Sequence, residues 1–296
     1  MPTKFNERVA VLLPLYNPEP YLFDQLESLA SQDIEKFDLI WGVSKDENNS
    51  IPAIDAMCAF TNNYFVDING LSASNAFFKL LSKAAEYDYV AFCDQDDIWE
   101  KSKLSKQVAS LKQFENSVAL SHSNFTILND KNFNVVDNCY SHKVDTLLEG
   151  NCARGCTMVL NKKLVRTILE SPVERMIWHD WWTILIASAY GVIVKNVEPL
   201  TKYRLHERNL VGIPGIRRRL INFIHRKKGT SLNMGLALLT MADELGVLPP
   251  QELIHWIKIY EKRGFNRILG TLFSPRKRKK ILDDLIRRVA FCVKIP

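Results

Sequence analysis

Short apolar segments and amphipathic helical segments alternate over the first third of the sequence. Apolar spacing typical of helices covers residues 21–31 and 72–86. Before, between and after these helices lie segments typical of buried strands: Val9–Leu13, Leu39–Val43, Tyr64–Ile68 and Tyr89–Cys93. This alternation predicts an α/β fold, with parallel strands joined by right-handed crossovers. We expect Pro14 to end the first strand, because proline lacks the backbone N–H that a ladder needs.

Polar residues follow each of these predicted strands. The four segments are Pro14-Leu-Tyr16-Asn17, Ser44-Lys-Asp46, Asn69-Gly70 and Asp94-Gln-Asp96-Asp97. Ligands of parallel sheets bind outside the carboxyl ends of the strands. We therefore expect the four segments to meet at one edge of the sheet and to form a binding site there.

The segment Asp94-Gln-Asp-Asp-Ile-Trp99 is the most informative of the four. Carboxylates this close together repel one another and usually have a cation between them. A hard divalent cation accepts oxygen ligands and can also hold a diphosphate. The alternative is a solvated Asp-rich turn that caps a helix beginning near Lys101.

The middle of the chain is less regular. We expect a loop over 144–155 and a helix from Trp178 to Tyr190. Further strands are predicted over 118–128, 156–160 and 192–197, and a further helix over 162–169.

Composition and cysteine usage narrow the class of protein. The chain has 296 residues, of which 47% are hydrophobic and 24% charged, as in soluble globular proteins. No run of 18 apolar residues is present, and the N-terminus lacks an apolar signal core. Without a C-x-x-C pair, we expect reduced cytosolic thiols and disfavour a zinc site. The cysteines are Cys58, Cys93, Cys139, Cys152, Cys156 and Cys292.

The charge is unevenly distributed along the chain. From Arg217 onward there are 18 Lys and Arg but 6 Asp and Glu, whereas residues 1–216 are net acidic. Basic residues flank apolar stripes near 216–228 and 274–289, which predicts basic amphipathic helices. These helices either pack on the body with solvated basic faces or contact an anionic membrane surface. Nucleic acid is disfavoured, because few aromatic residues and no nucleic-acid motif accompany the basic clusters.

Five motifs in order resemble the family 2 glycosyltransferases of GT-A fold, over roughly residues 8–212. They are Pro14–Asn17, Ser44–Asp46, Asp94–Trp99, His179-Asp180-Trp181-Trp182 and Tyr203–Asn209. The Asp94 and His179 strings are most similar to the rhamnosyltransferase-like branch, which builds bacterial surface polysaccharides. The resemblance implies a GT-A domain over 1–213, a Rossmann-like mixed sheet flanked by helices. A basic helical extension then covers 214–296.

The resemblance also implies a donor site. Asp96, Asp97 and His206 would bind Mg²⁺ or Mn²⁺, although His206 could instead be a packing residue and Arg204 could contact phosphate. Lys45 and Glu47 stand where Asp and Gly are usual, so the choice between uracil and thymine stays open. The residues implied to bind the nucleotide sugar are Pro14, Tyr16, Asn17, Asp46, Asn75, Asp94 and Asp96.

On the acceptor side, Asp180 resembles the catalytic base of inverting transfer, which removes the proton of the acceptor hydroxyl. The alternative is a helix-capping Asp180 followed by core tryptophans. Family members often have Glu where this chain has His179, which leaves that acceptor contact open. The implied acceptor residues are Arg154, Gly155, His179, Trp181 and Trp182; Arg154 could equally be a surface arginine.

Together these features predict an inverting, metal-dependent glycosyltransferase. Its donor would be a dTDP- or UDP-sugar, with dTDP-rhamnose as one candidate, and its acceptor a lipid-linked glycan at the cytoplasmic face of the cell membrane. A sugar nucleotidyltransferase would need a Gly-rich phosphate loop after the first strand, and Pro14–Pro18 contains no glycine. An inactive membrane-bound scaffold is the other alternative, and the presence of Asp96, Asp97 and Asp180 argues against it.

Overall fold

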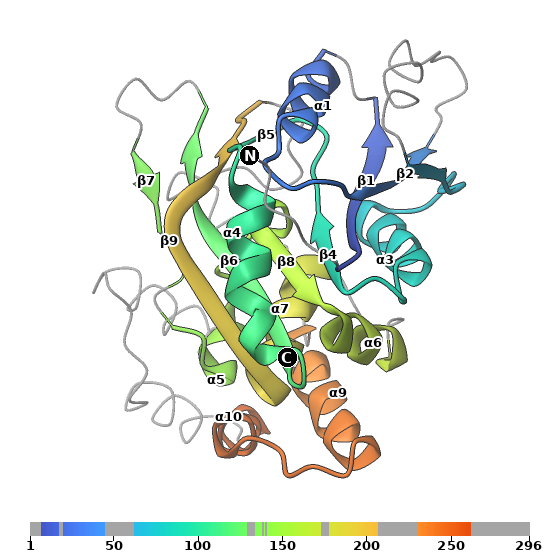
Figure 1. Cartoon of the computed structure of the whole chain (residues 1–296). Helices are drawn as coiled ribbons and strands as arrows, with labels where there is room; N and C mark the ends of the chain where they lie inside the picture. Colours follow the sequence, from blue (N-terminus) through green and yellow to red (C-terminus); the bar gives the residue numbers. More distant parts are fainter. Residues whose placement is uncertain are drawn as a thin grey trace.

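A nine-stranded mixed sheet runs through the centre of the computed structural model (Figure 1). The structure describes residues 7–17, 20–44, 62–128, 134–137, 139, 141–172, 178–206 and 230–261. The strands are β1 (Val9–Tyr16), β2 (Asp38–Ser44), β3 (Asn63–Phe65), β4 (Tyr89–Phe92), β5 (Ile98–Trp99), β6 (Val118–Ile127), β7 (Val135–Val136), β8 (Met158–Asn161) and β9 (Gly191–Tyr203). Their order is β3-β2-β1-β4-β8-β6-β9-β5, with β7 paired to β6.

Helices flank this sheet. They are α1 (Leu22–Ala30), α3 (Ala73–Lys83), α4 (Lys103–Leu111), α5 (Val144–Glu149), α6 (Lys162–Glu170), α7 (His179–Tyr190), α9 (Thr230–Glu244) and α10 (Gln251–Glu261). Two short 3₁₀ helices are η1 (Lys112–Phe114) and η2 (Gly155–Thr157). The α/β class predicted from the sequence is therefore confirmed.

Strand pairing changes from parallel to mixed along the sheet. β1 pairs in parallel with β2 and β4, and β2 with β3, as the alternating pattern predicts. β8 then lies antiparallel between β4 and β6, and β9 runs parallel to β6. The sheet is thus the mixed, helix-flanked sheet that the resemblance implied.

Alternating side chains of β1 bury against two different layers. Val11 and Leu13 face the cluster that α1 and α4 complete, whereas Ala10 and Leu12 face the larger cluster of α3, α6 and α7. Because successive strand residues point to opposite faces, a strand that is apolar throughout must be covered on both sides. This double burial fixes the central strands, whose carboxyl ends carry the polar segments.

The prediction that Pro14 ends the first strand is wrong, because β1 continues to Tyr16 and pairs Pro14 with Gly42 of β2. The Leu12 carbonyl accepts a hydrogen bond from the Cys93 backbone N–H, 2.9 Å away, on the side of β4. Pro14, two residues later, faces the same side, where β4 has ended. Its missing N–H therefore costs no ladder bond.

Two further elements differ from the sequence prediction. The expected loop over 144–155 contains α5, in which Val144, Leu147 and Leu148 are buried at helical spacing. The strand expected over 192–197 extends over Gly191–Tyr203, because β6 pairs along it past two register shifts. This longer strand carries the chain to Arg204 and His206.

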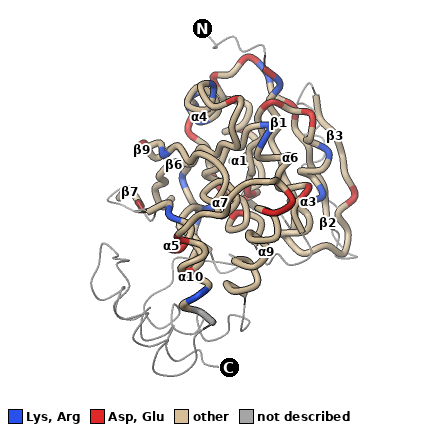
Figure 2. The backbone as a smooth tube through the Cα atoms, turned by 90° about the horizontal axis from the view of Figure 1, so that it is seen from below, with Lys and Arg blue, Asp and Glu red and all other residues tan. Residues whose placement is uncertain are grey.

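The C-terminal helices α9 and α10 pack beside α5, at the lower end of the view in Figure 1. Met234, Leu238 and Trp256 belong to the same buried cluster as Trp182 of α7. The predicted basic helices near 216–228 and 274–289 lie outside the described residues. In the described part of the chain, acidic and basic residues are interspersed (Figure 2). Among the helices described, none is long and apolar enough to cross a membrane.

The expectation of six reduced thiols is wrong for one pair, because Cys139 and Cys152 form a disulfide. The segment between β7 and α5 folds back onto the loop that precedes η2, and this brings together two residues that no short motif connects. Cys93 and Cys156 are buried free thiols. Cys58 and Cys292 lie outside the described residues.

Candidate functional site

Two of the predicted polar segments meet at the carboxyl ends of β1 and β4. The Gln95 side chain joins them: its Oε1 accepts from the Tyr16 backbone N–H at 2.6 Å, and its Nε2 donates to the Tyr16 carbonyl at 2.7 Å. The Tyr16 hydroxyl donates to the Leu71 carbonyl at 2.6 Å. Gln95 was not among the predicted site residues, and only its place inside the acidic segment could have indicated it.

The late Tyr203–His206 segment reaches the same place through β9, which pairs with β5 directly after the acidic segment. The Arg204 backbone N–H donates to Asp97 Oδ1 at 3.0 Å, and Arg204 Nε donates to the Asp96 carbonyl at 2.8 Å. A second guanidinium nitrogen donates to Asp24 Oδ2 at 2.6 Å. Arg204 therefore holds the acidic segment in place.

The structure brings Asp96 and His206 into contact. His206 Nε2 lies 2.7 Å from Asp96 Oδ2, with both side chains largely buried. The imidazole stacks on Tyr21 at a centroid distance of 4.9 Å, and the Arg204 guanidinium lies over the same ring at 4.5 Å. The structure thus places two of the three predicted metal ligands, Asp96 and His206, next to each other.

Asp97 lies with Asp94 and Cys156 in a cluster whose ligand atoms are all within 4.8 Å of one another. Asp97 is fully buried, and its Oδ2 accepts no hydrogen bond from any described residue. Burial, followed by the Asp96 and Asp180 charges, raises the pKa of Asp94 to about 7. Burial and the Asp94 charge also raise the pKa of Asp97. Buried carboxylates with raised pKa values and an unused oxygen fit a divalent cation.

A buried lysine, Lys103, lies close enough to this cluster to interact electrostatically with Asp97. Lys103 Nζ donates to Gln107 Oε1 at 2.7 Å and lies 4.8 Å from the centre of the Trp99 ring. Burial lowers the pKa of Lys103 to about 8, while the Asp97 charge acts in the opposite direction. Sequence reasoning missed this residue. The available signal was a lysine and a glutamine four residues apart on the apolar face of α4.

Asp180 lies in the first turn of α7, whose N-cap residue is Trp178. Asp180 is therefore not the helix cap that the alternative interpretation expected. Its Oδ1 accepts from the Trp181 backbone N–H at 2.7 Å. Burial raises the pKa of Asp180 to about 6, against the lowering effect of this hydrogen bond and of the Arg154 charge. Asp180 and Arg154 also influence the pKa of Asp94. The three charged groups therefore belong to one site.

The two tryptophans that follow Asp180 lie in the core. Trp181 and Trp182 are fully buried, and their ring N–H groups donate to the Leu147 carbonyl at 2.6 Å and to Ser171 Oγ at 2.9 Å. Both predicted acceptor residues are therefore core side chains, because neither ring has an exposed face. The indoles instead fix the start of α7 and so position Asp180.

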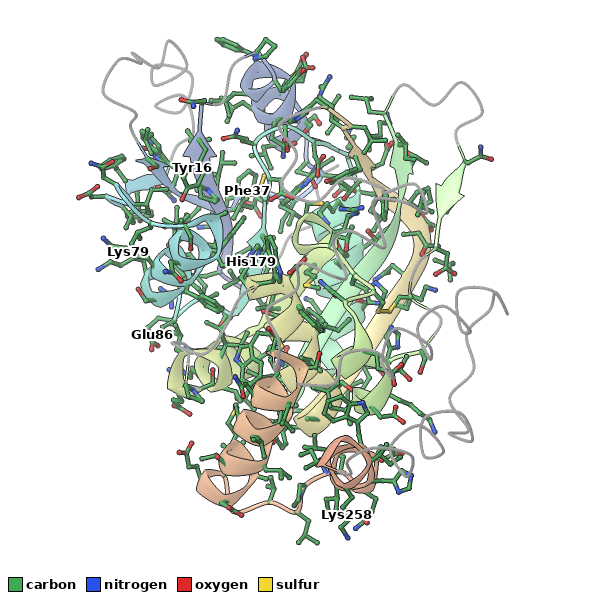
Figure 3. The ribbon with its side chains drawn as sticks, turned by 180° about the vertical axis from the view of Figure 1, so that it is seen from behind. Tyr16, Phe37, Lys79, Glu86, His179 and Lys258 are labelled. Atoms are coloured by element: carbon green, nitrogen blue, oxygen red, sulfur yellow. A yellow bond between two sulfur atoms is a disulfide. The ribbon has the colours of Figure 1, made fainter. Side chains whose placement is uncertain are left out.

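His179 also lies inside the fold (Figure 3). Its ring stacks on Phe77 at 4.0 Å and meets the edge of Phe92 at 4.9 Å. Burial lowers the pKa of His179 to about 3. A Cβ on Gly155 would lie 2.7 Å from His179 Nε2, so a glycine is needed for this close approach. The predicted acceptor residues Gly155 and His179 thus pack against each other.

Arg154 is held by two aromatic rings. Its guanidinium lies 4.1 Å from the Tyr203 ring centre and 5.2 Å from that of Phe125. It is therefore an ordered, partly buried arginine beside two carboxylates rather than a free surface residue. Such a cation could favour the ionised form of Asp180 or contact an acceptor phosphate.

The remaining predicted donor residues lie around the end of β1. Pro14 is buried, and Asn17 follows the strand in the left-handed region, with φ 45°. Asn75 is exposed in the first turn of α3, where its backbone N–H donates to the Ser72 cap at 3.3 Å. Asp46 lies outside the described residues.

Comparison with known proteins finds similarity to glycosyltransferases. Residues 10–155 match the family model "Glycosyl transferase family 2". The chain is 27% identical to the dTDP-rhamnosyl transferase RfbG of Shigella flexneri over 221 residues, which is 67% of this chain and 72% of that protein. It is 25% identical to the UDP-Glc:alpha-D-GlcNAc-diphosphoundecaprenol beta-1,3-glucosyltransferase WfgD of Escherichia coli, over 68% and 79% of the two chains.

Solved structures share the fold. Residues 1–349 of S. aureus TarS in complex with UDP superpose with a TM-score of 0.57 at 15% identity, over 98% of this chain and 81% of that one. Against a longer TarS structure, the chain spans 49% of the length. The mannosyltransferase PcManGT of Pyrobaculum calidifontis, in complex with GDP-Man and Mn2+, gives a TM-score of 0.54 at 15% identity, over 98% and 87% of the two chains.

The raised pKa of Asp94 predicts an unusual dependence of stability on pH. Between the ordinary value of 3.8 and about 7 the folded state binds more protons than the unfolded state. The free energy of unfolding should therefore fall as pH rises through this window. Asp94→Asn should flatten the slope, as measured by urea unfolding in a chelator from about pH 5 to about pH 8. Asp67→Asn, at an exposed position, is the control. Equal slopes in wild type and Asp94→Asn would contradict the prediction.

Proposed function

We infer that this chain, whose residues 10–155 match the glycosyl transferase family 2 model, is a glycosyltransferase of GT-A fold. On that premise we propose that it transfers a sugar from a dTDP- or UDP-sugar to a lipid-linked bacterial surface polysaccharide, with inversion and with a divalent metal. Rhamnose is the favoured sugar, because RfbG is a dTDP-rhamnosyl transferase. The observation that carries the proposal is that Asp94 clusters with Asp97 at the carboxyl end of β4 and interacts with both Asp180 and Arg154.

The donor half of the proposal rests on the acidic segment. Asp96, Asp97 and His206 would hold Mg²⁺ or Mn²⁺, with Asp94 as a neighbouring oxygen ligand. A bound ion supplies neutralisation of the charge that develops on a diphosphate leaving group. Arg204 keeps Asp97 and the Asp96 backbone fixed through its hydrogen bonds. Tyr16 and Asn17, together with Pro14, Asp46 and Asn75, would contact the nucleotide sugar.

The acceptor half rests on Asp180. A carboxylate that takes a proton from the acceptor hydroxyl works best when its pKa lies near the working pH. Burial supplies this by raising the pKa of Asp180 to about 6, and Arg154 keeps the ionised form accessible. The buried Trp181 and Trp182 hold the first turn of α7 in place. Inversion follows if Asp180 acts on the face opposite the leaving group.

The cellular part of the proposal concerns the basic C-terminal segment, residues 217–296. The 18 basic against 6 acidic residues after residue 216 favour an anionic membrane surface at the cytoplasmic face of the cell membrane. The name of WfgD specifies a diphosphoundecaprenol-linked acceptor, and we infer a lipid-linked acceptor for this chain as well. Nucleic acid is not part of the proposal.

The donor site is tested by a screen of dTDP-, UDP- and GDP-sugars with Mn²⁺, in which the release of the nucleoside diphosphate is measured. We expect one nucleotide class to dominate and a chelator to abolish the reaction. Asp97→Asn should weaken Mn²⁺ and nucleoside diphosphate binding together, because the ion links the protein to the diphosphate. Unchanged affinity for both in calorimetric titration would exclude Asp97 from the metal site.

A second variant separates the two halves of the site. Asp180→Asn should lower the turnover rate by about 10²–10⁴-fold, the usual contribution of a general base. Donor affinity should change little, because the base acts on the acceptor. In the wild type the logarithm of kcat/KM should fall below about pH 6, as Asp180 becomes protonated. A variant with wild-type turnover would remove Asp180 from this role.

The proposed membrane contact is tested with vesicles. The full-length chain should cosediment with vesicles of anionic phosphatidylglycerol and not with neutral phosphatidylcholine, and added salt should release it. Replacing the five basic residues of 276–280 by glutamine is expected to weaken binding without touching the described body. Failure of the full-length chain to bind anionic vesicles at low salt would reject the membrane contact and leave the proposed transfer intact.

A further inference from the structure

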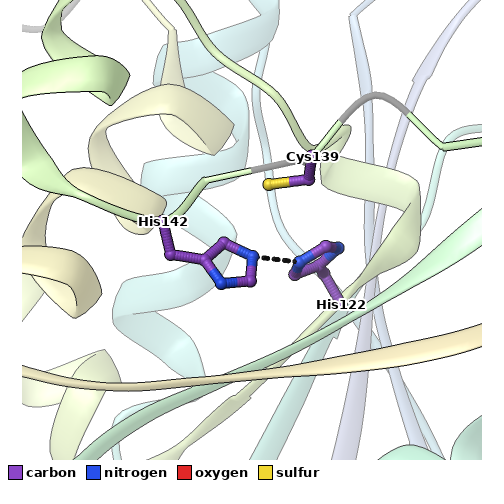
Figure 4. A group of neighbouring side chains, drawn as sticks. All are labelled: His122, Cys139 and His142. Carbon is purple, nitrogen blue, oxygen red and sulfur yellow. Dashed lines mark hydrogen bonds between the residues drawn. The ribbon is translucent and has the colours of Figure 1, made fainter. Parts of the chain in front are cut away.

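A group of metal-binding side chains lies apart from the acidic cluster. His122 of β6 faces His142, which precedes α5, and their Nε2 atoms are 2.8 Å apart. Cys139 lies beside them, and the ligand atoms of the three residues are all within 4.8 Å of one another (Figure 4). His122 and Cys139 are buried, with 2% and 4% of their surface exposed.

A fourth ligand is available in Cys152, which is bonded to Cys139. Cys152 and Cys139 line the same small cavity as His122 and Arg154. The four side chains come from β6, from the segment between β7 and α5, and from the loop before η2. Two imidazoles and two sulfurs converge here from three separate segments, and neither the family model nor the proposed transfer assigns them a role.

We propose that His122, His142, Cys139 and Cys152 bind one Zn²⁺ ion once the disulfide is reduced. Two histidines and two cysteines form a usual donor set of tetrahedral zinc sites. Reduction requires a two-electron reductant such as a dithiol: two electrons and two protons pass to the Cys139–Cys152 bond, and the dithiol becomes a disulfide. Zinc binding then releases both thiol protons, because the thiolate is the ligand. Oxidation reverses the exchange and expels the ion.

The surroundings favour a soft ion over the Mg²⁺ or Mn²⁺ of the acidic site. Nitrogen and sulfur ligands select zinc, whereas carboxylate oxygens select the harder ions. Burial lowers the pKa of both His122 and His142, so both rings are neutral near pH 7, which is the form that binds metal. In the contact between the two neutral rings, one Nε2 carries a proton and the other accepts it. With a bound ion, the donor ring would carry this proton on Nδ1 instead, so that both Nε2 atoms could act as ligands.

A second layer of polar contacts fixes the backbone of the cysteine ligand. The Cys139 backbone N–H donates to Asp137 Oδ1 at 3.2 Å, and its carbonyl accepts from Lys195 Nζ at 2.8 Å. Lys195 also pairs with Asp137 at 2.6 Å. Such outer contacts orient the ligands of metal sites. The Lys195 charge also disfavours the imidazolium form of His122 and His142.

The site would control the position of Arg154. Cys152 lies two residues before Arg154, so the ion would tie this loop to β6 and to the segment before α5. This consequence, unlike the zinc site itself, rests on the proposed function, in which Arg154 lies beside the base. In the oxidised protein the disulfide would hold this loop, whereas in the reduced protein the zinc ion would hold it. Acceptor binding would therefore depend on redox conditions.

The test uses the untagged full-length chain without nucleotide, so that it is independent of the proposed transfer. After reduction with a phosphine, incubation with Zn²⁺ and desalting, we expect about one zinc per chain by mass spectrometry. The oxidised chain should retain much less. His122→Ala and Cys139→Ser should lose the ion, whereas the control His255→Ala, at an exposed position of α10, should keep it.

Cobalt distinguishes this site from the acidic cluster, which contains the thiol of Cys156. Thiolate-to-cobalt charge-transfer absorption should persist in Cys156→Ser and disappear in Cys139→Ser. Circular dichroism checks that the variants fold, and the comparison of oxidised with reduced wild type needs no variant. Absence of zinc from the reduced wild type, or equal zinc in His122→Ala and His255→Ala, would overturn the proposal. So would cobalt absorption that depends on Cys156 instead of Cys139.

Discussion

Repulsion among buried carboxylates is the constraint on which this site depends. Asp94 and Asp97 lie close together and mostly out of water, and burial alone disfavours their charged forms. The protein offsets part of this cost with fixed donors: the Arg204 backbone N–H to Asp97, and the charges of Arg154 and Lys103 nearby. These groups leave one Asp97 oxygen without a hydrogen bond from the described residues. The cluster therefore lowers the stability of the fold, and the proposed divalent cation would offset the remaining repulsion between the carboxylates.

Much of the architecture is predictable because it follows from burial patterns. The strands β1, β2 and β4 are apolar on both faces, so a doubly covered parallel sheet is the packing that satisfies them. The order of the motifs then places the acidic segment at the carboxyl ends. The misses have local causes. Pro14 is tolerated because β4 ends early. The short helix α5 has too few turns for its spacing to stand out from a loop.

The site was only partly predictable, for a different reason. Asp180 and the acidic segment are visible because charges after or within apolar runs are conspicuous. The burial of Trp181, Trp182 and His179 is harder to predict, because a sequence cannot show which side of a helix faces the core when both sides are apolar. The helix α7 is apolar around most of its circumference, and the structure buries both indoles. Gln95, Lys103 and the Cys139–Cys152 pair depend on contacts between distant segments, which a single sequence does not reveal.

The mixed part of the sheet explains how the two halves of the site are brought together. β9 runs parallel to β6 along its length and then pairs antiparallel with β5, directly after the acidic segment. The end of β9 therefore places Arg204 against Asp97 and His206 against Asp96. The ring of Tyr203, the last residue of β9, packs against the Arg154 guanidinium. The same β6 that aligns β9 also carries His122. A change in the anchoring of the loop at Cys152 would thus reach Arg154 through a rigid frame, because β6, β9 and η2 are packed against one another.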